Sequence, residues 1–124
     1  MIGGHAVGYH GYPRATGDLD VWIVVHEENA RRMVSAVRAF GFDLPDLSPD
    51  LFLREDRVIR MGIEPNRIEI QTGISGIEFS EVYPRRVMAQ FEGVLVNIIP
   101  LEDLKTNKKA SGRYQDLADL ENLP

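Results

Sequence analysis

Cysteine is absent from the 124-residue sequence, which excludes disulfides, cysteine metal ligands and cysteine nucleophiles. This absence fits a reducing compartment, and we expect a cytoplasmic protein. The sequence has no long apolar run and no signal peptide, so we expect no membrane association. With 14 basic against 19 acidic residues and a formal net charge of −5, the chain has too little positive charge for broad, sequence-independent binding to nucleic acid.

The length fits one domain over residues 1–124, large enough to bury an apolar core without disulfides or structural metals. Apolar runs predict strands at 19–25, 57–63, 67–72, 87–91 and 94–99, with a turn around Pro65 and Asn66. Helical spacing and stop signals predict helices at 4–10, 27–40, 101–111 and 116–123. This order of elements favours an α+β fold in which one mixed sheet of four or five strands is covered by helices.

Residues 3–20 carry most of the functional information in the sequence. A glycine pair, Gly3 and Gly4, begins this stretch, and Asp18-Leu-Asp20 opens an apolar run at its end. Side chains alternate between the two faces of a strand, so Asp18 and Asp20 are predicted to point the same way. Two such carboxylates repel each other unless a cation lies between them, and Mg²⁺ and Mn²⁺ prefer oxygen ligands. The alternative is that both aspartates cap the start of the strand.

The chain resembles the nucleotidyltransferase superfamily, which has a polymerase-beta-like fold, and within it the small bacterial branch that includes the AbiEii-type toxins. The matching positions at the front of the chain are Gly3, Gly4, His10, Gly11, Arg14, Thr16, Asp18 and Asp20. Residues 67–76 resemble the strand that bears the third carboxylate of that family, and residues 107–119 resemble its closing helical motif. The three motifs occur in the family's order over nearly the whole chain, so the resemblance implies a nucleotidyltransferase-like fold.

The resemblance implies a metal-dependent enzyme that moves a nucleoside monophosphate from a nucleoside triphosphate to an acceptor hydroxyl. Asp18 and Asp20 would bind Mg²⁺ or Mn²⁺, and Glu69 would act as third ligand and as a base toward the acceptor. Family members usually have an aspartate at the position of Glu69, whose side chain is one methylene longer. The alternative for Glu69 is a solvent-facing position on a strand. The acceptor would be RNA, a protein side chain or a small molecule.

The nucleotide would meet residues at both ends of the chain. Gly3 and Gly4 would let the backbone approach a phosphate, or they form an ordinary tight turn. Arg14 and Thr16 would touch phosphate, or they hold the loop in place. A basic cluster lies near the C-terminus and consists of Lys105, Lys108, Lys109 and Arg113. The resemblance implies that a lysine such as Lys105 or Lys109, together with Arg113, meets the triphosphate; the alternative is a solvated helix face.

Two further expectations concern the ends of the chain. In the resembling family a helix and a hydrophobic strand precede the glycine pair, whereas here only Met1 and Ile2 do, so we expect a shortened N-terminus. A natural short form, a misplaced gene start or a strand supplied by another chain would each explain this, and an open sheet edge would allow homodimerisation. Near the other end, Asp116 and Asp119 flank apolar leucines, and we interpret them as a helix start and surface.

Two readings compete with an active enzyme. The glutamate at position 69 and the short front end favour a catalytically degenerate protein that binds a nucleotide or a partner. The third reading is a toxin-like subunit that needs an antitoxin partner. The intact Asp18, Asp20 and glycine pair argue for retained metal and nucleotide binding, so we take the nucleotidyltransferase as the leading prediction, whereas the sequence does not choose the acceptor.

Overall fold

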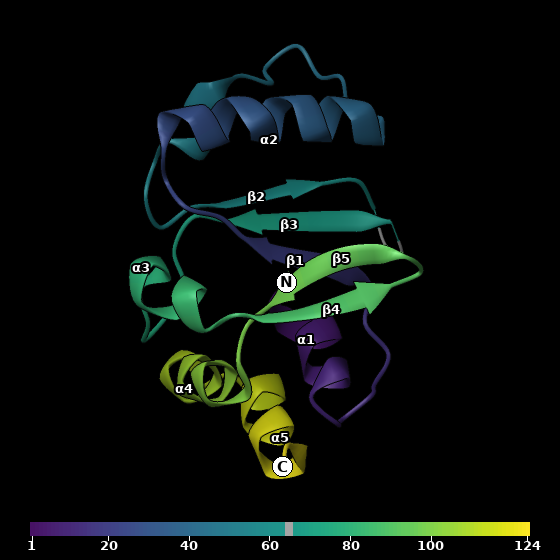
Figure 1. Cartoon of the computed structure of the whole chain (residues 1–124), viewed down its shortest axis with the longest axis vertical. Coiled ribbons are helices and arrows are strands. Elements are labelled where there is room, and N and C mark those ends of the chain that lie inside the picture. Colours follow the sequence, from purple (N-terminus) through teal and green to yellow (C-terminus); the bar gives the residue numbers. More distant parts are fainter. Residues whose placement is uncertain (64–65) are drawn as a thin grey trace.

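The computed structural model describes residues 1–63 and 66–124. Along the chain the elements are α1 (Gly3–Tyr9), β1 (Asp18–Trp22), α2 (Glu27–Phe40), β2 (Val58–Met61), β3 (Arg67–Gln71), α3 (Phe79–Val82), β4 (Val87–Phe91), β5 (Val94–Ile98), α4 (Leu101–Ser111) and α5 (Tyr114–Asn122), with short 3₁₀ turns at Pro49–Phe52 and Tyr83–Arg85. The predicted α+β class is confirmed (Figure 1). None of the helices in the described ranges is long and apolar enough to cross a membrane.

The strands form two sheets, so the predicted single sheet of four or five strands is wrong. The first sheet has the order β1-β3-β2 and is mixed, because β1 runs parallel and β2 antiparallel to β3. The second is the β4–β5 hairpin. Its turn residues Glu92 and Gly93 have φ of 50° and 83°, the positive values that a tight hairpin turn of this kind requires. Periodicity located every strand but carries no information about which strands pair.

The β2–β3 pairing is antiparallel, as expected for the predicted hairpin-like pairing. Of the two residues predicted to turn between these strands, Pro65 lies outside the described residues. The main chain of Asn66 donates a hydrogen bond to the carbonyl of Ile63 at 2.8 Å.

The first two residues lie between the two sheets. The main-chain N–H of Ile2 donates to the carbonyl of Asp20 in β1 at 3.0 Å. The N-terminal ammonium of Met1 donates to the carbonyl of Asn97 at 2.7 Å, and Ile99 donates back to the Met1 carbonyl at 3.1 Å. This two-residue segment therefore ties the edge of β1 to the edge of β5.

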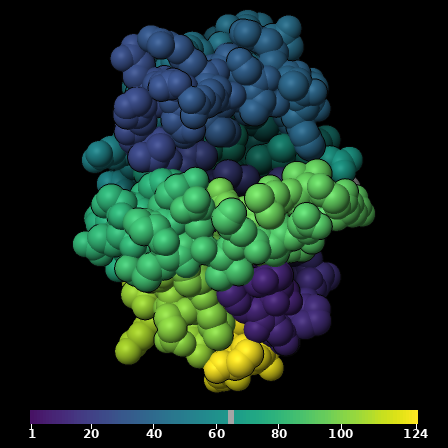
Figure 2. All heavy atoms as spheres, in the orientation of Figure 1, coloured from purple at the N-terminus to yellow at the C-terminus, as the bar shows by residue number. Residues whose placement is uncertain are grey.

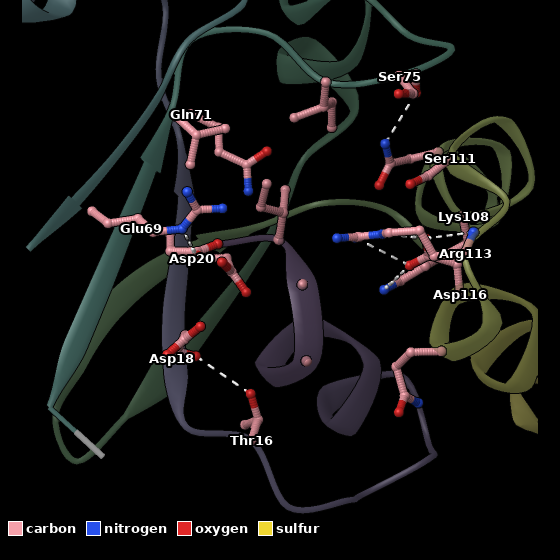
Figure 3. A pocket seen from close by; sticks show the side chains of 18 of the residues that line it. Thr16, Asp18, Asp20, Glu69, Gln71, Ser75, Lys108, Ser111, Arg113 and Asp116 are labelled. Atoms are coloured by element: carbon pink, nitrogen blue, oxygen red, sulfur yellow. Dashed lines mark hydrogen bonds and ion pairs between the residues drawn. The ribbon is translucent and has the colours of Figure 1, made fainter. Parts of the chain in front are cut away.

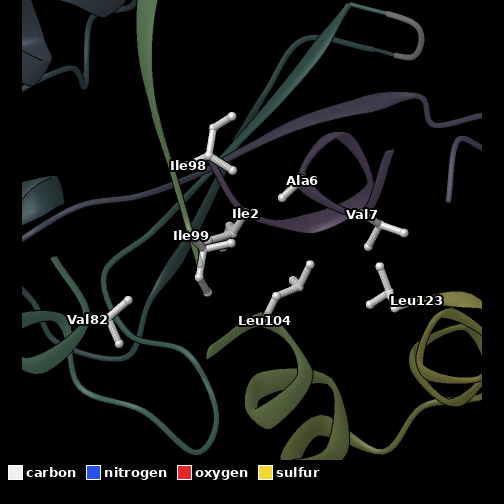
Figure 4. Close-up of a cluster of buried hydrophobic side chains, with 8 residues drawn as sticks. All are labelled: Ile2, Ala6, Val7, Val82, Ile98, Ile99, Leu104 and Leu123. Atoms are coloured by element: carbon white, nitrogen blue, oxygen red, sulfur yellow. The ribbon is translucent and has the colours of Figure 1, made fainter. Parts of the chain in front are cut away.

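Two apolar cores lie on opposite sides of the three-stranded sheet. Helix α2 covers one face, where Ala30, Val34 and Val37 pack with Ile23 and Ile70. The N-terminal residues, α1, α4 and the β4–β5 hairpin build the second core (Figure 4), whose buried members are Ile2, Ala6, Val7, Val82, Ile98, Ile99, Leu104 and Leu123. In the space-filling view the hairpin crosses the middle of the molecule, between α2 and the layer of α1, α4 and α5 (Figure 2).

Glycines end two of the helices as the sequence predicts. Gly41 follows α2 with φ of 118°, and Gly112 follows α4 with φ of 67°. Both are left-handed conformations that residues with a Cβ rarely adopt. Helix α5 begins two residues before its predicted start, and the Asp116 carboxylate caps it by accepting from the main-chain N–H and the Nε of Arg113 at 3.2 and 2.8 Å.

Candidate functional site

Three predicted carboxylates come together at the β1–β3 pair. In this parallel register Asp18 lies opposite Arg67, and Asp20 lies opposite Glu69. The side chains of Asp20 and Glu69 are close neighbours in Figure 3, and Asp18 lies farther along β1. All of them line a cavity of about 1050 Å³ between the polar face of the sheet and helices α1, α4 and α5. The solvent-facing alternative for Glu69 does not describe this position, since its side chain is 14% exposed.

Asp20 has the most unusual electrostatic environment in the cavity. Burial, a hydrogen bond to Glu69 and the nearby charges of Glu69 and Asp18 raise the pKa of Asp20 from 3.8 to about 7, against a lowering influence of Lys108. A neighbouring carboxylate disfavours the ionised form of a buried carboxyl group. Asp20 is therefore partly protonated near neutral pH, at a place where a cation would favour its charged form.

Arginines from the neighbouring strands contact two of the carboxylates. Arg67 donates two hydrogen bonds to Asp18, from Nε at 2.9 Å and from Nη2 at 2.7 Å. Arg67 holds the pKa of Asp18 below its usual range, chiefly through this hydrogen bond. Arg60 in β2 donates from Nε to Glu69 at 2.7 Å. Asp18 and Glu69 thus have cationic partners already.

The glycine pair is required by close packing against these residues. Gly3 has φ of 68°, and a Cβ added there would collide with the side chain of Asp20. A Cβ on Gly4 would lie 2.6 Å from Thr16 Oγ1 and 3.2 Å from an Arg14 nitrogen. The absence of side chains at the start of α1 therefore lets Asp20 and Thr16 approach the helix backbone.

Thr16 and Arg14 hold the loop that joins α1 to β1. The Thr16 hydroxyl donates to the main-chain oxygen of Asp18 at 3.4 Å (Figure 3). Arg14 donates from Nε and Nη2 to the two carboxylate oxygens of Asp119 in α5, at 2.8 and 2.9 Å. Both side chains line the cavity, so positions that fix the loop also face the site.

A buried ionic network closes the cavity on the side of α4 and α5. Lys108 Nζ lies 3.0 Å from Asp116 Oδ1 and 3.0 Å from Asp119 Oδ2. Arg113 donates to Asp116 at 2.8 Å, and Gln115 donates to Asp119 at 2.9 Å. The interpretation of Asp116 and Asp119 as surface residues is wrong, since they are 1% and 0% exposed. Their leucine neighbours suggested an exposed face, but the packing of α4 against α5 brings Lys108 to both aspartates, and the fold brings Arg14 to Asp119.

Hydrogen bonds explain why the buried aspartates remain charged. Burial alone would raise the pKa of Asp116, but hydrogen bonds from Arg113, Ser111 and Lys108 outweigh it and lower the pKa to about 2. Burial acts in the same way on Asp119, and hydrogen bonds from Arg14, Lys108 and Gln115 again lower its pKa. The network is therefore ionised at neutral pH, with its charges paired inside the protein.

Only some of the predicted basic residues line the cavity. Arg113 lines the cavity. The ammonium of Lys105 donates to the carbonyl of Pro124 at 2.9 Å, and Lys109 is exposed on α4; neither lines the cavity. Lys108, between them in the sequence, is a buried lysine in the cavity lining, and its ammonium pairs with Asp116 and Asp119 of α5.

The carboxylates of the cavity provide part of the ligand set that a divalent cation needs. Within the described residues, no group of three or more histidine, cysteine, aspartate or glutamate side chains is arranged to hold a metal ion. Asp20 and Glu69 converge, and the raised pKa of Asp20 marks where a positive charge would be favourable. Asp18 lies on the same strand face but is held by Arg67. A cation at Asp20 and Glu69 suits the chemistry present, and Asp18 would join it if Arg67 moved.

Sequence reasoning missed two residues that shape this site. Arg67 alternates with Glu69 and Gln71 along β3, so strand periodicity could have placed it on the same face as the carboxylates. Lys108 was seen only as part of a basic cluster, and its burial depends on packing between α4 and α5.

A scan against protein-family models found no matching family, and a search of the curated proteins found no matching sequence.

Proposed function

We propose that the cavity binds a nucleoside triphosphate together with Mg²⁺ or Mn²⁺, and that the protein transfers the nucleoside monophosphate to an acceptor hydroxyl. The observation that carries this proposal is the Asp20–Glu69 pair, whose mutual repulsion and burial raise the pKa of Asp20 to about 7. Two adjacent carboxylates, one of them with a raised pKa, are a favourable place for a divalent cation. The cavity of about 1050 Å³ is large enough for a nucleotide.

Several residues of the cavity suit the polyanionic part of such a ligand. The backbone at Gly3 and Gly4 is open to close approach, and Arg14, Arg60, Arg67 and Arg113 line the same cavity. Guanidinium groups match phosphate oxygens in geometry and charge. In a protein with a net charge of −5, this local gathering of arginines supports an anionic ligand.

The reaction would be an in-line displacement at phosphorus. The acceptor oxygen forms a bond to the α-phosphorus, the bond from that phosphorus to the bridging oxygen of the β-phosphate breaks, and pyrophosphate leaves. The proton of the acceptor hydroxyl passes to Glu69. A bound divalent cation would neutralise phosphate charge at Asp20 and Glu69, while Arg113 and Arg14 would hold the triphosphate in place.

A second function, nucleotide binding without catalysis, is favoured by one specific observation. Arg67 occupies both oxygens of Asp18, the residue that an active site of the resembled family would use as a metal ligand. If this ion pair persists when nucleotide binds, the cation keeps only two carboxylates, and the transfer step loses a ligand.

The experiment is thermal unfolding with each nucleoside triphosphate, with and without Mg²⁺ or Mn²⁺, followed by assay of pyrophosphate release. Ligands that bind the folded state raise the melting temperature. We compare the wild type with Asp20→Asn and Glu69→Gln, and use Glu28→Gln on exposed α2 as a control that makes the same change. A metal-dependent shift that both site variants lose supports the site. Release of pyrophosphate then supports transfer, a shift without it favours binding alone, and no shift contradicts both functions.

A further inference from the structure

The large cavity changes in chemistry along β3. The residues of this strand that line it are, in chain order, Arg67, Glu69 and Gln71. Arg67 and Glu69 lie opposite the two aspartates of β1, whereas Gln71 lies opposite Val58 of β2. In Figure 3, Gln71 and Asp18 lie on opposite sides of Glu69. The strand therefore leads from the charged middle of the cavity to an end where an uncharged amide faces a valine.

Two loops enclose this end of the cavity, and hydrogen bonds hold each of them. The Thr72 hydroxyl accepts from the main-chain N–H of Arg57 at 2.8 Å and donates to the carbonyl of Arg54 at 2.7 Å, which holds the loop before β2. Asn107 of α4 donates from Nδ2 to the carbonyl of Ser75 at 3.0 Å, which holds the loop after β3. The walls are therefore preformed, as those of small-molecule sites usually are.

The carboxylate of Asp56 lies at the same end because position 73 is a glycine. The β2–β3 register pairs Val58 with Gln71, and two more residues along both strands set Asp56 across from Gly73. A Cβ added to Gly73 would collide with Asp56 Oδ1 and would lie 3.2 Å from its Cγ. Asp56 and Gly73 both line the cavity. The carboxylate therefore rests against the end of the strand that carries the Gln71 amide.

The polar atoms of Asp56 and Gln71 are available to a ligand. Within residues 1–63 and 66–124, no hydrogen bond or ion pair holds the carboxylate of Asp56 or the amide of Gln71. By contrast, Asp18, Glu69 and Asp116 each accept from an arginine. The uncharged end of the cavity thus offers one free carboxylate and one free amide beside a centre whose charges are already paired.

On the basis of the proposed function, we propose that this end holds the base of the nucleotide and selects a base that carries an exocyclic amino group. The α-phosphate lies at Glu69 and Asp20, and the base lies farther along β3, at Gln71. Residues two apart on a strand are separated by about 7 Å, a span comparable to that from the α-phosphorus across the ribose to the base. Val58 and Ile74, which line this end, provide apolar contacts for the faces of the base.

The hydrogen-bonding chemistry of the two side chains explains the selection. An ionised carboxylate only accepts hydrogen bonds, whereas an amide both donates and accepts. The amino groups of adenine, cytosine and guanine donate, and the carbonyl group that uracil has in place of the cytosine amino group accepts. Asp56 therefore binds the amino group and repels the carbonyl, while the Gln71 amide pairs with either kind of base.

The test compares two pairs of nucleotides that differ at this group: ATP with ITP, and CTP with UTP. Each is titrated with Mg²⁺ by calorimetry into the wild type and into Asp56→Asn. We expect ATP and CTP to bind about tenfold more tightly than their partners. Asp56→Asn should reduce this ratio to about twofold, because an asparagine amide also donates. Asparagine accepts the positive φ of 56° at this position, so we expect the variant to fold.

Two further variants serve as controls. Glu55 is the adjacent exposed carboxylate and does not line the cavity, so Glu55→Gln should keep the wild-type ratios. Gln71→Met removes the amide with little change of volume and should weaken the binding of all four nucleotides about fivefold, as the loss of one hydrogen bond implies. It should leave the affinity for inorganic tripolyphosphate with Mg²⁺ unchanged, since that ligand has no base.

Adenosine and inosine, titrated without a cation and followed by ligand-observed NMR, separate this proposal from the proposed function. Ratios near one for both nucleotide pairs, or ratios that Asp56→Asn retains, overturn the base site while nucleotide binding stands. If no triphosphate binds, the proposed function fails. A preference for adenosine over inosine that Asp56→Asn abolishes would then still support the base site, whereas equal binding of the two nucleosides, or none, would overturn it as well.

Discussion

Arg67 binds both carboxylate oxygens of Asp18, with Nε–Oδ1 and Nη2–Oδ2 distances of 2.9 and 2.7 Å. The two residues lie opposite each other on the parallel strands β3 and β1. The ion pair is partly exposed to solvent, with 32% of the arginine and 17% of the aspartate side chain accessible. Such a pair is weak enough to exchange for a better ligand, so a cation that bound Asp18 would have to displace Arg67.

The first prediction concerns this competition. Replacing Arg67 with glutamine frees Asp18, so Mn²⁺ without nucleotide should bind about two- to fivefold more tightly, the range of one exposed ion pair. Electron paramagnetic resonance of free Mn²⁺ measures this affinity. Arg31→Gln, the same charge change on exposed α2, is the control and should leave the affinity unchanged. Weaker Mn²⁺ binding in the Arg67 variant would contradict the competition.

The second prediction follows from the raised pKa of Asp20. Its pKa is about 7 in the folded protein against 3.8 ordinarily, so the folded state holds more protons than the unfolded state between these values. The free energy of unfolding therefore falls as pH rises from about 4 to about 7. Asp20→Asn should flatten this fall and stabilise the protein above pH 7 by about 1 kcal/mol or more. Urea unfolding across this pH range measures it.

The control for that experiment is Glu28→Gln, which removes a carboxylate from the exposed face of α2. It should retain the pH dependence of the wild type. If Asp20→Asn keeps the same slope between pH 4 and 7, the carboxylate pair does not hold a proton and the electrostatic basis of the site is wrong.

The third prediction concerns the buried ionic network. Lys108→Met leaves Asp116 and Asp119 with less positive charge in the interior, and breaking a buried pair in this way costs about 3 kcal/mol of unfolding free energy. The adjacent Lys109 is exposed, so Lys109→Met is a matched control that should change stability by less than about 0.5 kcal/mol. Chemical denaturation measures both. Equal effects of the two substitutions would show that Lys108 is not part of a buried network.

The fourth prediction concerns acid unfolding. The pKa of Asp116 is about 2 in the folded protein and 3.8 ordinarily, so its contribution to stability is complete above pH 4 and is lost as pH falls toward 2. Asp116→Asn should be less stable than the wild type at neutral pH and should lose less stability between pH 4 and 2. Circular dichroism of denaturant unfolding at these pH values measures the slope, and parallel wild-type and variant curves would refute the assignment.

The fifth prediction concerns the glycine pair. Gly4→Ala places a Cβ at 2.6 Å from Thr16 Oγ1 and should destabilise the protein by about 1–3 kcal/mol, as overpacking does. Gly8 lies in the same helix, and a Cβ there would meet only Pro13 Cα at 3.8 Å, an ordinary contact. Gly8→Ala is therefore the control, and we expect it to be neutral or stabilising by up to about 1 kcal/mol. Adding Thr16→Ser to Gly4→Ala should not recover stability, because the hydroxyl that collides is retained, whereas Thr16→Ala should recover part of it.

Much of the local structure could be predicted from sequence because its causes are local. The apolar run after Asp18 forms β1, the acidic pair Glu27-Glu28 begins α2, and Gly112 ends α4. Strand alternation also placed Asp18 and Asp20 on one face, and the structure brings Glu69 beside them. The strand, the helix ends and the shared face of Asp18 and Asp20 each depend on residues a few positions apart, whereas the position of Glu69 depends on strand pairing.

What failed depends on residues far apart in the chain. The division of the strands into two sheets follows from which edges meet, and Met1 and Ile2 hold the two edges together through hydrogen bonds to Asp20 and Asn97. The burial of Asp119 depends on Arg14, which is 105 positions away. Such contacts leave no periodic signal around either residue.

The sequence by itself determined the class of fold, the positions of its helices and strands, and the gathering of Asp18 and Asp20 on one strand face, because propensity, periodicity and glycine stops act over a few residues. Only the tertiary structure decided that Arg67 holds Asp18, that Glu69 and burial raise the pKa of Asp20, and that Lys108 is buried between two aspartates. The physical reason is that the pKa and the partners of a carboxylate depend on burial and on charges a few ångströms away in space. Those distances are set only when the chain folds.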